Sequence, residues 1–442
     1  MKLALLYIPL ALVVPAVAGA QVPVRPLGAV VSTSTDSLGI VGHLRALPGG
    51  RVLVNDVQRR RVVLMDSTMK VMRVVIDSTT GSADAYGPRP GGLIAWKGDS
   101  TLFVDPASLS MLVIDAEGRI ARVMSVPRTQ EAGALTSISF GTPALDAEGR
   151  LVYRAFPGQQ FRAVGGPGGA VAAPQSPPDS AAIIRLDLAT RKVDTAAFIR
   201  IPKVSINMNR SEDGQVSISQ TINPLPMVDD WAVTSTGRLA IVRGRDYRVD
   251  WVGANGAVAS TGKIPFDWRR LTDDDKVALI DSVKAQRERM GTQGAVAGGG
   301  APIMAFGGAG GGATAAAAET RVQMTTTIRG GASGAPGATT TSSSNVRANI
   351  DFVSPSELPD YQPPFFAGAV RADADGNIWI RTIPTRAIGG GPVYDVVDEK
   401  GELVDRVQLP EGREIRAFGP DGTVFLMSRG PVGTVIERAR VR

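Results

Sequence analysis

The sequence contains no cysteine and only one histidine, His43. A zinc site of the usual histidine and cysteine kind cannot be built from these residues, and disulfide bonds are excluded. A single histidine also argues against a serine–histidine pair, and no Gly-x-Ser-x-Gly sequence marks a nucleophile. We therefore expect no cofactor. The sequence identifies no catalytic residue, and we interpret His43, which lies in a predicted strand, as structural.

The net charge is small and aromatic residues are few. The net charge is +6 over 442 residues, aromatic residues make up 5% of the chain, and no run of lysine or arginine suits a nucleic acid. The composition, 43% hydrophobic and 20% charged, is ordinary for a globular protein. A chain of this length can bury a large core without disulfides. We expect a monomer with no nucleic-acid partner.

The first 20 residues have the pattern of a secretory signal peptide. Lys2 is their only charge, Leu3–Val14 is apolar, and Ala18-Gly19-Ala20 resembles a cleavage site before Gln21. The alternative is an uncleaved anchor, but the apolar run is short for a membrane span of roughly 20 residues. The sequence therefore predicts a periplasmic or secreted protein with no membrane span after cleavage.

One unit recurs along the rest of the chain, and Leu44–Asp66 is its clearest copy. A turn at Gly50 leads into Val52 and Val54, which alternate with polar residues as in a half-buried strand, and a second strand follows at 62–65. Where no segment is inserted, the turn recurs every 46–50 residues or so. Repeats of about this length with four strands each are typical of propeller blades. The other turns fall at Asp99, Gly149, Gly237, Gly376 and Gly422.

The clearest copy also resembles a known family. Gly50-Arg-Val52-Leu-Val54-Asn-Asp56 followed by Arg61-Val62-Val-Leu64 is similar to an NHL-type repeat of the six-bladed β-propeller group, although Arg59 and Arg60 replace the usual asparagine and histidine. The other five units keep only the turn residue and the strand pattern. The resemblance implies an all-β, six-bladed propeller over residues 21–442. It implies no particular activity, because propellers host many functions.

The N-terminal segment offers a way to close such a ring. Ala29–Ser32 and Gly39–Leu44 are strand-like, and the sixth unit ends at Arg442 with three strands. We expect an N-terminal strand to complete the last blade, since closure removes exposed sheet edges. Deleting Val22–Val31 should then lower the melting temperature.

Three segments interrupt the repeats: Pro157–Ser180, Lys203–Val228 and Phe266–Gly368. The last contains a predicted helix over 270–290, with Thr272 as its N-cap, and a Gly/Ala/Thr/Ser-rich stretch over 291–349 that we expect to be disordered. Because strands in a blade alternate in direction, all three interruptions fall on one face of the propeller. The face is either a tolerant place for insertions or a binding surface.

The second strand of each blade should end on that same face. Arginines occupy four of these ends, and an arginine fork binds carboxylate or phosphate well. We therefore predict a site for an anionic ligand at the mouth of the channel; the alternative is that each arginine pairs with a neighbouring aspartate or with solvent. The candidate ligand-binding residues are Asp56, Asp105, Arg154, Arg243, Arg381 and Arg429.

A calcium site has little support in the sequence. Asp373, Asp375 and Asn377 resemble the start of a calcium loop, but Ile378 stands where that loop requires glycine, so we interpret the segment as a hairpin turn. Three functions remain open. The first is a non-catalytic binding module for a small anion or a protein partner. The second is a calcium-dependent hydrolase or lactonase of the gluconolactonase-like propeller type. The third is a purely structural envelope protein.

Overall fold

The computed structural model describes residues 22–442 except 80–84, 138–140, 157–160, 165–170, 175–177, 211–215, 294–321, 324–344, 387–388 and 431–432. The predicted signal peptide, most of the predicted low-complexity stretch 291–349 and much of the Pro157–Ser180 insertion lie outside the described residues. No helix in the described part of the chain is long and apolar enough to cross a membrane.

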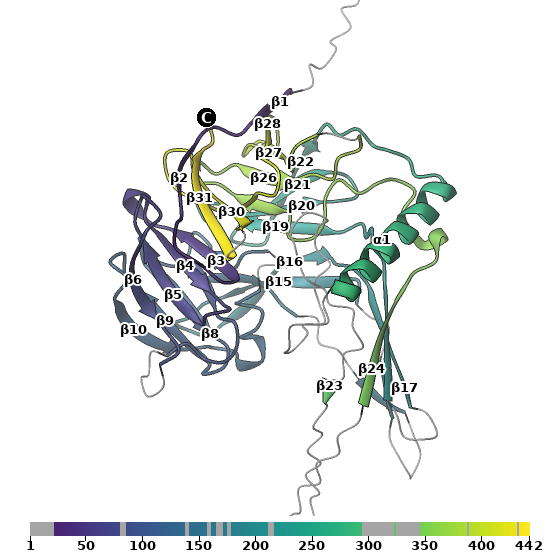
Figure 1. Cartoon of the computed structure of the whole chain (residues 1–442), viewed down its shortest axis with the longest axis horizontal. Coiled ribbons are helices and arrows are strands. Elements are labelled where there is room, and N and C mark those ends of the chain that lie inside the picture. The colour runs from purple at the N-terminus through teal and green to yellow at the C-terminus, as the bar shows by residue number, and fades with distance from the viewer. Residues whose placement is uncertain are drawn as a thin grey trace, which may run out of the picture.

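The chain folds mainly into antiparallel four-stranded sheets that follow one another in sequence and lie around a common centre (Figure 1). This confirms the predicted all-β class and its propeller-like arrangement. The first three sheets contain β3 (Val41–Ala46), β4 (Val52–Asp56), β5 (Arg61–Met65) and β6 (Val71–Ile76); β7 (Gly92–Ala95), β8 (Thr101–Asp105), β9 (Ser110–Ile114) and β10 (Ile120–Ser125); and β11 (Ala144–Leu145), β12 (Leu151–Arg154), β15 (Ser180–Leu186) and β16 (Val193–Arg200).

The next three sheets repeat this plan. They contain β19 (Asp229–Val233), β20 (Leu239–Arg243), β21 (Arg248–Val252) and β22 (Val258–Lys263); β25 (Val370–Ala372), β26 (Ile378–Arg381), β27 (Val393–Val397) and β28 (Leu403–Gln408); and β29 (Glu414–Phe418), β30 (Thr423–Gly430), β31 (Gly433–Arg440) and β2 (Val30–Thr33). Single-turn 3-10 helices are η1 (Pro48–Gly50), η2 (Thr129–Glu131) and η3 (Pro355–Glu357).

The N-terminal strands join the two sheets that end the chain. β2 pairs antiparallel with β31, so an N-terminal strand completes the last sheet, as predicted. β1 (Val24–Pro26) adds a parallel fifth strand beside β28, and Arg25 bonds Asp405 there at 2.6 Å. These pairings cover two sheet edges that would otherwise be exposed.

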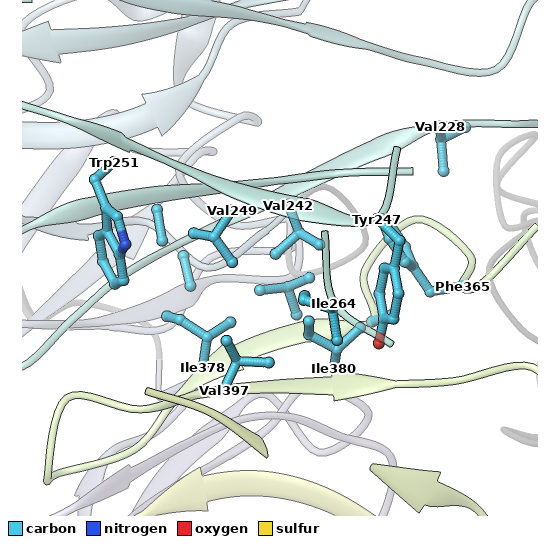
Figure 2. Packing of buried hydrophobic residues seen from close by; sticks show 14 residues of the cluster. Val228, Val242, Tyr247, Val249, Trp251, Ile264, Phe365, Ile378, Ile380 and Val397 are labelled. Carbon is cyan, nitrogen blue, oxygen red and sulfur yellow. The ribbon is translucent and has the colours of Figure 1, made fainter. Parts of the chain in front are cut away.

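Neighbouring sheets pack face to face through apolar side chains. Figure 2 shows one such layer between the fourth and fifth sheets, where Val242 and Val249 meet Ile378 and Ile380. All five residues of β4 are buried, because its sheet is covered on both faces. The predicted half-buried alternation over Val52–Asp56 is therefore wrong in detail. The outermost strands of these sheets, such as β6 and β22, expose most of their side chains.

The turns between strands share one hydrogen-bonding pattern, in which an aspartate carboxylate accepts backbone N–H groups. The carboxylate of Asp373 accepts hydrogen bonds from the N–H groups of Asp375 and Asn377 and from the indole of Trp379, while Gly376 adopts φ 90°. The side chain thus replaces backbone partners in a tight turn. This confirms that the segment is a hairpin turn. Equivalent bonds organise the turns at Asp66, Asp115, Asp146 and Asp398.

Two of the insertions combine into an additional sheet, which the sequence did not predict. β17 (Val204–Arg210) and β18 (Val216–Ile222) form a hairpin, and β24 (Asn345–Phe352) joins β18 in parallel, with β23 (Val322–Gln323) at its edge. Residues 345–349, which we expected to be disordered, are thus part of a strand. In the first insertion, Pro157–Ser180, β13 (Phe161–Val164) pairs with β14 (Val171–Pro174).

Helix α1 (Asp273–Gln293) confirms the predicted helix, although it begins and ends three residues later. Thr272 caps it, because the Thr272 hydroxyl accepts from the Asp275 N–H while the Asp275 carboxylate accepts from Thr272. Ile280 packs the helix against Leu225 and Leu358, with Phe366 partly buried beside them. Figure 1 shows α1 next to the strands β24 and β17.

Candidate functional site

The two predicted aspartates close their own hairpins. Asp56, which is buried, accepts the Gly39 N–H at 3.0 Å and lies 3.3 Å from the Arg61 Nε. Asp105 accepts the Ala107 N–H and the Ser108 hydroxyl, each at 2.8 Å. Both carboxylates are therefore engaged within their own part of the fold, and the structure does not bring them together with the predicted arginines.

Arg243, one of the predicted arginines, is engaged by neighbouring acceptors. It bonds Asp250 at 2.6 Å, Asp229 at 2.9 Å and the Phe198 carbonyl at 3.0 Å. Its guanidinium therefore agrees with the alternative interpretation, in which each arginine pairs with a neighbouring aspartate. Arg429, near the end of β30, is exposed, and its part in a shared site stays a prediction.

The remaining two, Arg154 and Arg381, belong to a charged cluster near the first strands of the sheets. These strands lie beside one another: β3 with β7 and β29, β7 with β11, and β19 with β25. Arg154 interacts electrostatically with Asp230 of β19, and Arg381 with Arg416 of β29. We call the set defined by these mutual interactions the central cluster. Its members are His43, Arg154, Asp230, Arg371, Arg381, Tyr394, Glu414 and Arg416.

One face of the fifth sheet supplies three members. Arg381 and Tyr394 are directly opposite in the register of β26 and β27, and the Arg381 N–H bonds the Ala369 carbonyl, two residues before Arg371. Opposite residues, and residues two apart on a strand, point to the same side of a sheet. Arg371, Arg381 and Tyr394 therefore share a face, and the Tyr394 hydroxyl accepts a bond from the Ile415 N–H of β29.

A bulge presents the arginine of the sixth sheet. In β29, Ile415 pairs with Leu426 and Ala417 with Phe425, which leaves Arg416 as the extra residue. Bulges of this kind redirect a side chain and interrupt pairing. Arg416 lies 3.2 Å from Glu414, but its buried Nε has no hydrogen-bond partner among the described residues. Burial lowers the pKa of Arg416, and nearby Arg371 and Arg381 lower it further, against the opposing effect of Glu414.

His43 enters the cluster through a second bulge. Val41 pairs with Asp56 and His43 with Asn55, so Gly42 is the extra residue in β3. A Cβ at Gly42 would lie 2.8 Å from Val57 Cγ1, which explains the glycine. The His43 side chain is 7% exposed, and neither ring nitrogen has a hydrogen-bond partner in the described part of the chain. Burial, together with Arg416 and Arg371, lowers the pKa of His43 to about 3, so the ring is neutral.

Asp230 provides the only deeply buried carboxylate of the cluster. It is 2% exposed and accepts the Val370 N–H at 2.9 Å, which ties β19 to β25. Burial raises the pKa of Asp230 to about 6, although Arg371 and Arg154 favour the ionised form. Burial also lowers the pKa of Arg154 to about 10, so this guanidinium is still charged at neutral pH.

The residues of the cluster do not fit a calcium ion. Calcium takes roughly six to eight oxygen ligands, mostly from carboxylates and carbonyls. Here arginines outnumber carboxylates, and no group of three His, Cys, Asp or Glu side chains suited to a metal gathers anywhere in the described residues. The arrangement is instead cationic, with buried nitrogen donors.

Comparison with known proteins finds solved structures of low similarity to this chain. No protein-family model and no curated protein matches it. It is similar to a gluconolactonase from Xanthomonas campestris at 12% identity and TM-score 0.38, with 94% of this chain and 99% of that chain covered. It is similar to the calcium-binding protein regucalcin from Agrobacterium tumefaciens at 12% identity and TM-score 0.38, with 95% of this chain and 98% of that chain covered. A third similar structure is virginiamycin B lyase from Staphylococcus aureus, at 9% identity and TM-score 0.35, with 93% of this chain and 98% of that chain covered. At these values no activity or ligand carries over to this chain.

The sequence analysis missed five members of the cluster: Asp230, Arg371, Tyr394, Glu414 and Arg416. All but Tyr394 stand on the first strand of their sheet, where the pattern around them is that of an ordinary strand. A signal was nevertheless present. His43, Asp230, Arg371 and Arg416 put an ionisable side chain on the first strand of four different repeats. Comparing equivalent positions across the repeats, rather than strand ends alone, would have found the set.

Proposed function

We propose that the protein is an exported binding module and that its central cluster binds a small organic anion. The observation that carries this proposal is the grouping of Arg154, Arg371, Arg381 and Arg416 with two carboxylates of the described residues, Asp230 and Glu414. Like charges destabilise one another in a partly buried site, so such a grouping usually reflects a ligand of opposite charge. Arg371 and Arg381 are half-buried, which leaves them within reach of a solute.

Buried nitrogen atoms without hydrogen-bond partners support the same conclusion. The Arg416 Nε and both ring nitrogens of His43 are buried without hydrogen-bond partners among the described residues. Leaving such groups unsatisfied costs about 1–3 kcal/mol each. Carboxylate and phosphate oxygens are the acceptors that guanidinium groups bind most strongly.

We also propose that the six sheets close into a six-bladed ring of the NHL-repeat-like group. The contact of β29 with β3 joins the sixth sheet to the first, and the pairing of β2 with β31 supports closure. A protein lacking residues 22–33 should show a melting temperature several degrees lower in calorimetry, since it loses β1, β2 and the buried Leu27. An unchanged melting temperature would count against the ring.

Export is the third part of the proposal. The signal-peptide pattern over 1–20 supports it. N-terminal sequencing of the mature protein, recovered from the periplasm or medium, should begin at Gln21. A chain recovered with Met1 in the membrane fraction would favour the uncleaved anchor instead.

The alternative function, a calcium-dependent lactonase, would need a site of negative charge. It requires oxygen ligands for a divalent cation, whereas the described residues offer a surplus of arginines. One calorimetric experiment separates the two hypotheses. At constant ionic strength, acetate, phosphate and sulfate are compared with calcium chloride; a ligand at 100 times its Kd should raise the free energy of unfolding by about 2.7 kcal/mol.

The expected result is a saturable stabilisation by at least one anion, absent in Arg416→Gln and retained in Arg73→Gln. Arg73 is the matched control, because it is an exposed arginine on the outer strand β6. Stabilisation by calcium alone, or an anion effect that is equal in all three proteins, would refute the proposal.

A further inference from the structure

We infer that the anion bound by the central cluster is elongated and carries a second carboxylate, which Arg45 of β3 binds. This inference rests on the proposed function and specifies the class of ligand, a linear dicarboxylate. It follows from two positions on the first strands β3 and β29 that offer buried nitrogen donors without acceptors, and from the distance between these positions.

The first position joins His43 of β3 to Arg416 of β29. The two strands lie side by side, and a Cβ at Gly419 would lie 3.6 Å from the Ala46 Cβ. Three residues back from this contact stand Arg416 and His43, so the two side chains begin at about the same level. Both ring nitrogens of His43 and the Arg416 Nε are buried without hydrogen-bond partners among the described residues. A carboxylate placed here would accept from both side chains.

The strand opposite His43 does not engage its imidazole. Asn55 faces His43 in the register of β3 and β4, but its amide donates to the Gly91 carbonyl at 2.7 Å and accepts from the Tyr86 hydroxyl at 2.9 Å. These bonds tie the first sheet to the second and leave the imidazole available to a ligand.

The second position is Arg45, two residues further along β3. The pairing of β3 with β4 is regular from His43 to Arg45. Because residues two apart on a regular strand point to the same side, Arg45 follows His43 on one side of β3 at a distance of about 7 Å. A second acceptor of the same ligand can therefore reach Arg45 without leaving that side of the strand.

Arg45 has few acceptors of its own. It donates to the Ala46 carbonyl at 2.7 Å, and its Nε is buried without a hydrogen-bond partner in the described part of the chain. No carboxylate in that part forms an ion pair with Arg45, and Asp99 acts on it only from a longer distance. Burial lowers the pKa of Arg45, against the effect of Asp99. Burying a guanidinium with so few acceptors is less costly when a ligand supplies an anionic group.

One molecule suits the two positions better than two separate anions. Two anions about 7 Å apart repel each other, and each loses its own translational freedom on binding. A dicarboxylate holds both charges in one molecule and loses translational freedom only once. Carbon–carbon bonds are about 1.5 Å long, so malonate is too short for the spacing, whereas adipate can reach across it.

Isothermal titration calorimetry at pH 7 tests the inference with pairs of acids of equal chain length. Every carboxyl group is ionised at this pH, because ordinary carboxyl pKa values are about 4. Adipate should bind at least about tenfold more tightly than hexanoate, as expected for one additional charge-assisted bond. Malonate should gain less than about threefold over propanoate, since its second carboxylate cannot reach Arg45 while the first occupies His43 and Arg416.

Substitutions locate the second carboxylate. Arg45→Gln should lower the ratio of the adipate and hexanoate affinities to below about threefold and leave hexanoate binding unchanged. Arg416→Gln should weaken the binding of both acids, because it removes a donor from the first position. Arg73→Gln, the exposed control on β6, should leave both affinities and their ratio unchanged. Thermal melts without ligand establish that each variant is folded.

Arg45→Lys provides a second test if Arg45→Gln does not fold. Lysine retains the charge but lacks the Nε donor and the planar fork, so the ratio of the two affinities should fall at least about threefold. An unchanged ratio in folded Arg45→Lys would show that the fork does not bind the second carboxylate and would overturn the inference.

The outcomes separate the inference from the proposed function. Equal binding of adipate and hexanoate to the wild type, or a preference for adipate that persists in folded Arg45→Gln, would overturn the inference and leave anion binding intact. An advantage of malonate over propanoate as large as that of adipate over hexanoate would do the same. If none of these acids binds, and phosphate and sulfate do not bind either, the proposed function itself fails.

Discussion

Two kinds of arginine site occur in this protein, and they differ in the number of acceptors around the guanidinium. Arg243 has two aspartates and a carbonyl as acceptors, and Arg185, which is 2% exposed, donates to three carbonyls and lies 3.5 Å from Asp146. Arg416 has one acceptor among the described residues, Glu414, at 3.2 Å. Against the effect of burial, hydrogen bonds to Asp250 and Asp229 raise the pKa of Arg243, whereas burial lowers the pKa of both Arg185 and Arg416.

The difference indicates separate roles for the same residue type. A buried arginine whose acceptors are all supplied by the fold holds neighbouring turns and sheets together. Arginines gathered with a surplus of charge do not stabilise the fold, and such groups concentrate at binding sites. The following substitutions test this distinction through stability alone, without knowledge of the ligand.

The largest effect is expected for Arg185→Met. The substitution removes the donor to the carbonyls of Val252 and Gly253, whereas Asp146 keeps the Arg150 guanidinium at 2.8 Å. A buried carbonyl left without a donor costs about 1–3 kcal/mol of unfolding free energy, measured by urea denaturation. Arg73→Met serves as the exposed control. If Arg185→Met loses no more unfolding free energy than Arg73→Met, Arg185 is not a structural arginine.

An intermediate effect is expected from His43 at acidic pH. Its folded-state pKa, about 3, lies below the ordinary value of 6.5, so its stabilising contribution is complete above pH 6.5 and is lost as pH falls. Each pH unit below 6.5 costs about 1.4 kcal/mol, or about 3 kcal/mol at pH 4.5. His43→Gln lacks this dependence and should lose less stability between pH 7 and 4.5.

Asp230 changes the unfolding free energy with pH in the opposite direction, and it does so in both the wild type and His43→Gln. Its pKa is raised to about 6, so Asp230 stabilises the folded state at pH values below the ordinary carboxyl pKa, and this stabilisation is lost as pH rises through 6. The difference between wild type and His43→Gln therefore isolates the imidazole. Parallel pH profiles for the two proteins would show that His43 is not buried beside the arginines.

The smallest effect, with the opposite sign, is expected for Arg416→Met. Removing this side chain relieves repulsion with Arg371 and Arg381, and it leaves Glu414, which can be solvated at 22% exposure. We expect an unfolding free energy unchanged or raised by about 1 kcal/mol in urea denaturation. A loss of more than about 2 kcal/mol would show that Arg416 is a structural arginine like Arg185.

Local patterns in the sequence predicted most of the fold. The turn aspartates and glycines, the strands around Val52–Asp56 and the helix capped by Thr272 follow from neighbouring residues. The strand that completes the last sheet was predicted from the repeat, because the sixth unit has only three strands of its own. The sheet formed by β18 and β24 could not be predicted, because it pairs segments more than a hundred residues apart. Propensity gives no information about such partners.

The candidate site was only partly predictable for the same reason. Arg154 and Arg381 were found because they end their strands, whereas Arg371 and Arg416 become neighbours only when separate sheets assemble. His43 was assigned a structural role because a lone histidine in a strand has no local partner. Its significance depends on arginines more than 300 residues away in sequence.

The most direct test uses the fact that His43 is the only histidine. In untagged protein labelled with [15N]histidine, NMR reports the imidazole at the centre of the cluster and nothing else. The account predicts a neutral ring from pH 7 to 4.5, whose nitrogen resonances shift saturably when phosphate is added. A ring that titrates near its ordinary pKa of 6.5 and does not respond to phosphate would contradict it.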